Sequence, residues 1–84
     1  PSGEYRCERG ERLQIRRELA NAVNNRIQLG WHGGQYLLVR DPSYSGLPRF
    51  EDVASGLVWI DLPWKGLLLD GRTQKPLANE CRAT

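Results

Sequence analysis

The chain of 84 residues lacks several features on which common functions depend. It contains no methionine, one histidine and two cysteines, and it has neither a Cys-x-x-Cys pair nor the Cys/His spacing of a metal site. No G-x-S-x-G motif marks a hydrolase nucleophile, and the "GWHGG" stretch lacks the Lys-Ser/Thr that completes a phosphate-binding loop. We therefore predict a protein that is not an enzyme and that uses no metal or cofactor.

Long hydrophobic runs are also absent. No stretch approaches the 18 or more apolar residues that a membrane-spanning helix requires, so the body of the protein is predicted to be soluble. The missing methionine and the Pro1-Ser2-Gly3 start indicate a processed or trimmed product, compatible with removal of a secretion signal. The length predicts one domain over residues 1–84, with a core of about residues 4–82.

The two cysteines lie near the two ends of the chain. A domain this short buries only about 60% of its unfolded surface, so its core needs added support. The even count favours a structural Cys7–Cys81 disulfide, with two inert buried thiols as the alternative. A bond that closes nearly the whole chain would stabilise the fold by about 4 kcal/mol and would indicate an oxidising compartment.

Period-two alternation of apolar and polar residues dominates the chain. Residues 12–18 and 26–31 read as half-buried strands, and the denser apolar runs at 35–40 and 57–62 read as strands nearer the middle of a sheet. Turn signals at "HGG", "SG" and "DG" separate these runs. We predict an all-β fold, a small closed antiparallel barrel of about eight short strands. A helical turn within residues 16–28 is the competing interpretation.

The basic and aromatic residues do not form a nucleic-acid-binding pattern. The net charge is only +2, and acidic residues are interleaved with the basic ones near the N-terminus, which is typical of a solvated surface. Most aromatics at strand spacing are expected to pack in the core. Trp64 is the exception, because Pro63 before it and Lys65-Gly66 after it predict an exposed turn.

The segment "DPSYSGLPRF", residues 41–50, concentrates turn-forming residues between two apolar runs. Asp41-Pro42 and Ser45-Gly46 are turn dipeptides, so Ser43, Tyr44 and Ser45 are expected to project from the scaffold. Loops on rigid barrels commonly carry binding function, although an ordinary solvated loop explains these residues equally well. Together with "LPWKG" at residues 62–66, this loop is the candidate partner-binding surface.

The order of features resembles the MliC/PliC group of bacterial inhibitors of c-type lysozyme, over Tyr5 to Cys81. The similarity consists of "YRC" near the start, "SYSG" followed by an Arg and an aromatic residue, a Trp-containing strand, "KG", and a last strand ending in Cys. That family has eight-stranded antiparallel barrels with a disulfide reaching the C-terminal end. Members carry an S-G-x-x-Y motif and a T-K-G motif; here Phe50 follows with one extra residue, and Trp64 replaces the Thr.

The resemblance implies both a partner and a set of contact residues. Ser45 and Lys65 would enter the lysozyme cleft and meet its two catalytic carboxyl groups, as a hydroxyl and an ammonium can. The remaining expected partner-binding residues are Ser43, Tyr44, Gly46, Arg49, Trp64 and Gly66. The resemblance also implies the Cys7–Cys81 disulfide, and a location in the bacterial periplasm or at the outer membrane through an upstream lipid anchor.

Two other interpretations remain open. A structural or adhesive envelope domain could keep the barrel without inhibiting lysozyme, because a fold does not determine a function. A small nucleic-acid-binding barrel is the third; it would show salt-sensitive binding to single strands, and the interleaved acidic residues and the predicted disulfide disfavour it.

Overall fold

A computed structural model describes residues 3–20, 23–41 and 48–84 of the protein. For residues 18–20 and 23–25 it describes the backbone alone. The described residues form eight β-strands and one short 3-10 helix, η1 (Glu8–Gly10), and no α-helix. The strands are β1 (Gly3–Arg6), β2 (Arg12–Ala20), β3 (Val23–Trp31), β4 (Gly34–Arg40), β5 (Arg49–Asp52), β6 (Leu57–Asp61), β7 (Gly66–Asp70) and β8 (Pro76–Ala83).

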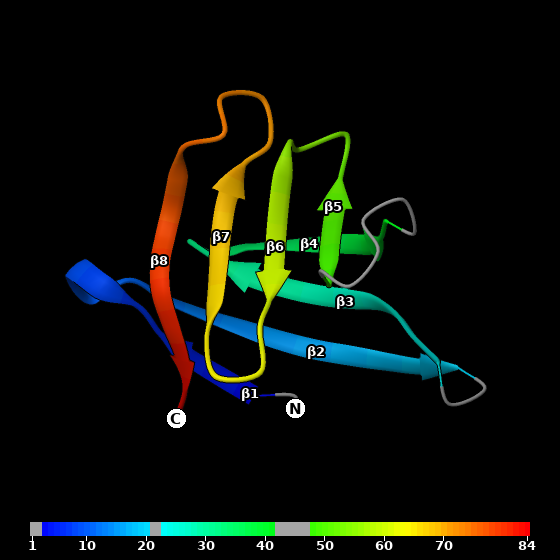
Figure 1. Cartoon of the computed structure of the whole chain (residues 1–84), viewed down its shortest axis with the longest axis horizontal. Helices are drawn as coiled ribbons and strands as arrows, with labels where there is room; N and C mark the ends of the chain where they lie inside the picture. The colour runs from blue at the N-terminus through cyan, green and yellow to red at the C-terminus, as the bar shows by residue number, and fades with distance from the viewer. Residues whose placement is uncertain (1–2, 21–22, 42–47) are drawn as a thin grey trace.

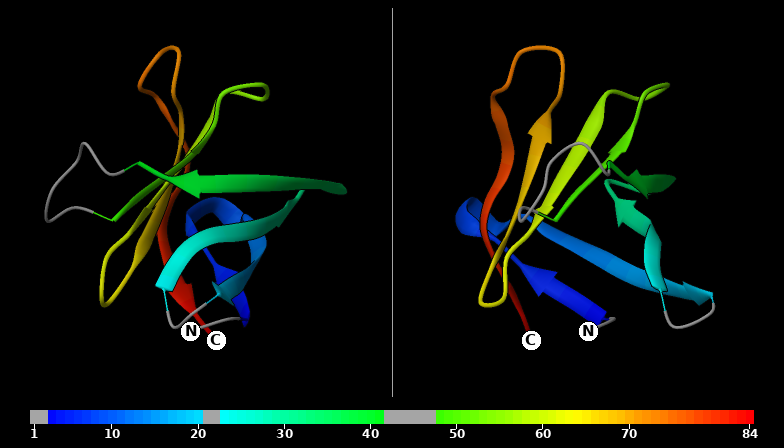
Figure 2. Two further views of the ribbon diagram at one scale, coloured as in Figure 1. Left: turned by 90° about the vertical axis from the view of Figure 1, so that its right-hand side faces the viewer. Right: turned by 45° about the vertical axis from the view of Figure 1, so that its right-hand side comes forward.

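The strands close into an antiparallel barrel in which each strand pairs with its neighbours in the chain and β8 returns to β1. In Figure 1, β5 to β8 stand side by side, and β2 and β3 cross them at a steep angle. The two views of Figure 2 show the same arrangement from the side. The predicted all-β closed barrel is confirmed, and closure removes most exposed sheet edges.

The core consists of the inward-facing positions of this barrel. Leu13 and Ile15 of β2 are buried, whereas Gln14 and Arg16 between them are exposed, as the alternation predicted. The fully or nearly fully buried apolar residues that pack together are Tyr5, Leu13, Ile15, Ile27, Leu29, Leu38, Phe50, Leu57, Trp59, Leu68, Ala78 and Cys81.

The two denser apolar runs do not behave alike. All of residues 57–60 in β6 are buried, but in β4 only Leu38 is, while Leu37 and Val39 are 44% and 47% exposed. Both strands have a hydrogen-bonded neighbour on each side, so neither is an edge strand, but β4 alternates like a half-buried strand whereas β6 does not. In a closed barrel every strand has two neighbours, so apolar density does not report a central position.

The helical interpretation of residues 16–28 is also wrong. The described residues of this segment belong to β2 and β3, which pair in register with Ile15 opposite Leu29 and Arg17 opposite Ile27. This register places Ile27 and Leu29 in the core with no exposure. The two-residue alternation, supported by burial of its apolar face in the barrel, thus outweighs a weak helical pattern.

The predicted turns join strands where expected. His32 and Gly33 connect β3 to β4 with φ angles of 48° and 77°, a conformation that suits glycine at the second position. Gly56 ends the β5–β6 connection with a φ of 79°, and Asp70-Gly71 begins the turn after β7. The described residues contain no helix long and apolar enough to cross a membrane.

The seam between β1 and β8 is short and covalently reinforced. Only Tyr5 with Ala83 and Arg6 with Arg82 pair across it, and Cys7 and Cys81, next in the same register, form a disulfide. The Thr84 backbone N–H also donates to the Glu4 carbonyl at 3.0 Å. The predicted disulfide is confirmed, and it links the end of β1 to β8.

Removing this disulfide should cost most of the stability of such a small domain. Replacing both cysteines by serine should lower the free energy of unfolding by about 4 kcal/mol, because the bond closes a loop with a sequence separation of 74. Urea denaturation of the oxidised protein and the double variant measures this difference. Equal urea midpoints would show that the two residue pairs hold the seam without the bond.

Candidate functional site

Pro48, just before β5, and the "LPWKG" turn lie together at one end of the barrel. The Asp61 backbone N–H, at the end of β6, donates to the Pro48 carbonyl at 2.9 Å, which ties the end of the loop to the strand before the turn. A hollow of about 350 Å³ opens there. This hollow, called the turn pocket below, is lined by Tyr5, Arg17, Pro48, Asp61, Leu62, Pro63, Trp64, Lys65 and Ala83.

The turn between β6 and β7 projects Trp64 into solvent. The Leu62 N–H donates to the Lys65 carbonyl at 3.0 Å and closes a four-residue turn with Pro63 and Trp64 in its middle. Pro63 restricts the backbone there. The Trp64 side chain is consequently 68% exposed, which confirms the predicted exposed turn. An exposed tryptophan on a closed turn is a ready anchor for a partner.

Lys65 lies beside Trp64 and already contacts a carboxylate. Its Nζ is 2.6 Å from Oε1 of Glu80 in β8, and the Arg82 guanidinium is 3.2 Å from the other oxygen of Glu80. The hydrogen bond from Lys65 is the main cause of a Glu80 pKa below the usual 4.5, and Arg82 adds to it. Since the folded-state pKa is lowered, this pair stabilises the fold above pH 4.5 and is lost as the pH falls through the lowered pKa.

Gly66, next to Lys65, is buried rather than presented. A Cβ at this position would overlap the Trp59 indole, with Cζ2 and Cη2 only 2.1 Å away. The glycine therefore lets β7 pass directly beneath the largest buried side chain of the core. This close packing is a structural reason for the Lys-Gly pair that is separate from any partner.

Arg49 lies apart from the turn pocket. It begins β5, its guanidinium is 3.5 Å from Glu51, and its side chain is 12% exposed. With Glu51, Val53 and Arg72 it lines a different hollow, beside the β5–β6 connection. The structure thus brings Trp64 and Lys65 together and places the Arg49 side chain elsewhere. The other predicted contact residues, Ser43, Tyr44, Ser45 and Gly46, lie outside the described residues.

A charged network at the base of the turn pocket escaped the sequence analysis. Arg17 of β2 donates two hydrogen bonds to Asp61, at 2.7 and 3.0 Å, and a third to the Tyr5 hydroxyl at 3.1 Å. The Trp59 indole N–H donates to Asp61 at 3.3 Å. Burial acts to lower the Arg17 pKa, but the hydrogen bonds and charge of Asp61, with Tyr5, outweigh it and raise the pKa.

One sequence signal could have found this network. Arg17 continues the inward-facing series of Leu13 and Ile15, and Asp61 continues that of Leu57 and Trp59. A charged residue at an inward position must find a partner, because an unpaired buried charge is costly. The two side chains are 10% and 17% exposed, and their pairing closes this end of the barrel.

His32 is held in a structural arrangement at the β3–β4 turn. Its ring stacks on Trp31 with centroids 4.0 Å apart, and both rings hydrogen-bond Oε1 of Glu11, Trp31 at 3.0 Å and His32 at 2.7 Å. Both bonds lower the Glu11 pKa, and the one from Trp31 contributes most to that shift. Within residues 3–20, 23–41 and 48–84, no three His, Cys, Asp or Glu side chains cluster as a metal site would require.

Comparison of the chain with protein-family models, curated proteins and solved structures gave no match.

The close packing of Gly66 can be tested by one added methyl group. Gly66→Ala should lower the free energy of unfolding by about 1–3 kcal/mol, because the new Cβ would force the Trp59 ring or β7 to shift. Gly30→Ala is the matched control in another strand, since its Cβ would meet only the flexible side chains of Gln14 and Gln35. Urea denaturation should show a loss for the first variant alone; equal midpoints would contradict this packing role.

Proposed function

We propose that the protein is a noncatalytic inhibitor of c-type lysozyme and that the barrel end with Trp64 and Lys65 enters the lysozyme active-site cleft. The observation that carries the proposal is the exposed Trp64-Lys65 turn beside the turn pocket. Pro48, the described residue just before β5, lines the same pocket and is bonded to Asp61. An exposed turn that bears both an aromatic ring and an ammonium group suits insertion into a cleft that holds carboxyl groups.

The contacts of Lys65 support its proposed role. Its ammonium binds the Glu80 carboxylate at 2.6 Å while the side chain remains 31% exposed, so it holds a carboxylate at the protein surface. Lysozyme has two carboxyl groups beside the scissile glycosidic bond. On insertion, Lys65 would exchange Glu80 for one of them, and the Ser45 hydroxyl would hydrogen-bond to the other.

Trp64 would supply the apolar part of the contact. Among the described residues, Trp64 has the most exposed aromatic ring, and it lies beside Lys65 on a closed turn. Tryptophan is enriched among residues that dominate binding energy at interfaces, because its large rigid surface loses little conformational entropy. Arg49, whose side chain lines another hollow, would contact the rim of the partner at most.

The proposed location is the bacterial periplasm or the outer membrane, with a lipid anchor upstream of the chain. The Cys7–Cys81 disulfide favours an oxidising compartment. The eight-stranded barrel with a disulfide near its C-terminal end has the architecture that the family resemblance implies. Fold alone does not fix function, so the argument depends on the turn.

A second candidate function is an envelope structural or adhesive domain that keeps this barrel without inhibiting lysozyme. The Lys65–Glu80 ion pair favours it, because an ammonium that is neutralised within the chain must first give up its partner. The two candidates differ in what happens when oxidised protein is titrated into a peptidoglycan suspension with c-type lysozyme. Stoichiometric loss of lysis supports inhibition, and undiminished lysis supports the structural domain.

Lys65→Ala should weaken inhibition by at least about tenfold, because the variant would leave a desolvated lysozyme carboxylate without the ammonium that pairs with it. The thermal midpoint should change by only a few degrees, since exposed ion pairs contribute little to stability. Lys75→Ala is the matched control: it removes the same charge from the β7–β8 turn, outside the turn pocket. Lysis assays measure inhibition, and thermal unfolding measures stability. Equal inhibition by the two variants would show that Lys65 does not contact lysozyme.

Glu80→Gln tests whether the internal ion pair competes with the partner. This variant keeps a hydrogen-bond acceptor near Lys65 but removes the charge that neutralises it. If Lys65 binds a lysozyme carboxylate, inhibition should become several-fold tighter, most clearly at low salt. The inhibition constant at two salt concentrations measures the change. Weaker inhibition would mean that Glu80 positions Lys65 rather than competing for it.

A further inference from the structure

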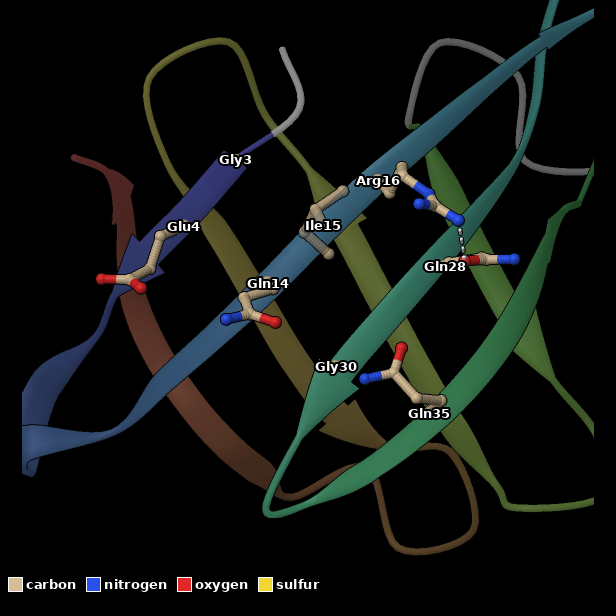
Figure 3. A pocket seen from close by; sticks show the side chains of 8 residues that line it. All are labelled: Gly3, Glu4, Gln14, Ile15, Arg16, Gln28, Gly30 and Gln35. Carbon is tan, nitrogen blue, oxygen red and sulfur yellow. Dashed lines mark hydrogen bonds between the residues drawn. The ribbon is translucent and has the colours of Figure 1, made fainter.

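A groove bordered by amide and charged side chains crosses the outer face of β1 to β4, away from the turn pocket. Two adjoining hollows of about 420 and 340 Å³ share four lining residues, Glu4, Gln14, Gly30 and Gln35, and so form one continuous depression. The groove runs from Arg16 and Gln28 at one end to Trp31 and His32 at the other. Figure 3 shows its first half with the lining side chains.

Gly30 creates the hollow. It pairs with Gln14 on one side and Gln35 on the other, and a Cβ at Gly30 would lie 3.2 Å from Gln14 Oε1 and 3.0 Å from Gln35 Nε2. Its φ is not positive, so the strand conformation does not require glycine. Glycine inside a strand weakens the sheet and often marks a place where a ligand or backbone approaches closely. Here the missing side chain lets the Gln14 and Gln35 amides come close above the strand, because even a Cβ would press on both.

The side chains around Gly30 offer both donors and acceptors. In Figure 3, the amides of Gln14 and Gln35 point toward one another across Gly30, and the Glu4 carboxylate lies on the far side of Gln14 from Gln35. Arg16 donates to the Gln28 amide oxygen at 3.1 Å, which holds that third amide in place. Within the described part of the chain, the side chains of Glu4, Gln14 and Gln35 bond no other protein group.

This chemistry selects a particular kind of ligand. Each amide presents two N–H donors and two acceptor lone pairs in one plane, which matches neighbouring hydroxyl groups that both give and accept hydrogen bonds. A polyanion such as nucleic acid would need a strongly positive face, but the lining carries Arg12 and Arg16 against Glu4, a net charge of only +1. An apolar ligand would leave the Gln14 and Gln35 amides unpaired. A neutral, hydroxyl-rich chain satisfies both.

The far end of the groove adds an aromatic surface. His32 is stacked on Trp31 at 4.0 Å and its side chain is 59% exposed, while Glu11 fixes both rings through hydrogen bonds. The C–H face of a sugar ring packs well on such a flat, preorganised ring. Amides at one end and a fixed aromatic stack at the other are the two elements of an oligosaccharide site.

We propose that this groove, with Gln14, Gln28 and Gln35 around Gly30 and the Trp31-His32 stack at its end, binds a neutral oligosaccharide chain. Neither Trp64 nor Lys65 lines it, so the site is independent of the proposed inhibition of lysozyme. The protein would then hold a glycan on one face while its turn pocket faces another partner.

NMR titration of the oxidised, isotope-labelled protein with chitohexaose and with cellohexaose tests the proposal. We expect at least one sugar to shift the side-chain amide signals of Gln14, Gln28 and Gln35 and the Gly30 backbone signal, with a dissociation constant of about 1 mM or lower. An extended decapeptide of Thr and Val is titrated in parallel. Shifts with the peptide but neither sugar, or no groove shifts up to about 10 mM sugar, would overturn the proposal.

Gly30→Val introduces a residue that suits a strand but displaces the Gln14 and Gln35 amides, and it should weaken sugar binding at least about tenfold. Gln14→Ala combined with Gln35→Ala is the second variant and should weaken binding equally, whether or not Gly30→Val folds. Asn79→Ala, which removes an exposed amide from β8 outside the groove, is the control and should bind as the unaltered protein does. Unchanged affinity in the folded groove variants would contradict the assignment.

Discussion

Closure of the barrel at the β1–β8 seam is the constraint on which the remaining structure depends. Only two residue pairs join these strands, and the Cys7–Cys81 bond continues their register as a covalent link. Without closure, β1 and β8 would be free edges and Tyr5, buried at 5% exposure, would lose its cover. A domain of this size buries too little surface to hold such a seam by packing alone. The disulfide therefore supports the shape of both proposed surfaces.

The core and the turn pocket are linked through Trp59. Its ring packs edge-on against Tyr5 at 5.3 Å, lies over Gly66, and donates to Asp61, which binds Arg17. The residues that position Lys65 thus belong to the hydrophobic core or to the Arg17–Asp61 pair that closes one end of the barrel. A substitution at Gly66 or Asp61 would alter the turn through the core. Lys65 and Trp64 differ from these residues, because they project from the turn and can change without disturbing the packing.

Much of the fold could be predicted, but only part of the candidate site. Alternation identified the strands, glycine pairs identified the turns, and the end positions of the cysteines indicated the disulfide. Apolar density did not predict that β4 and β6 differ in burial, because a run such as "YLLV" looks the same whether one face or both faces are buried. The Glu80 partner of Lys65 was not predicted, since the two lie 15 positions apart and meet only through the pairing of β7 with β8. The polar groove was missed for the same reason: Gln14, Gly30 and Gln35 are scattered in the sequence.

The sequence by itself determined the class of structure, the exposed Pro-Trp turn and the positions available for a covalent staple, because period, turn chemistry and cysteine count are local properties of the chain. The tertiary structure alone decided which side chains share a surface. It placed Arg17 against Asp61, Lys65 against Glu80, and Gly30 between two glutamines. Those neighbours depend on strand register around a closed barrel, and a shift of one residue would turn each of these side chains to the other face.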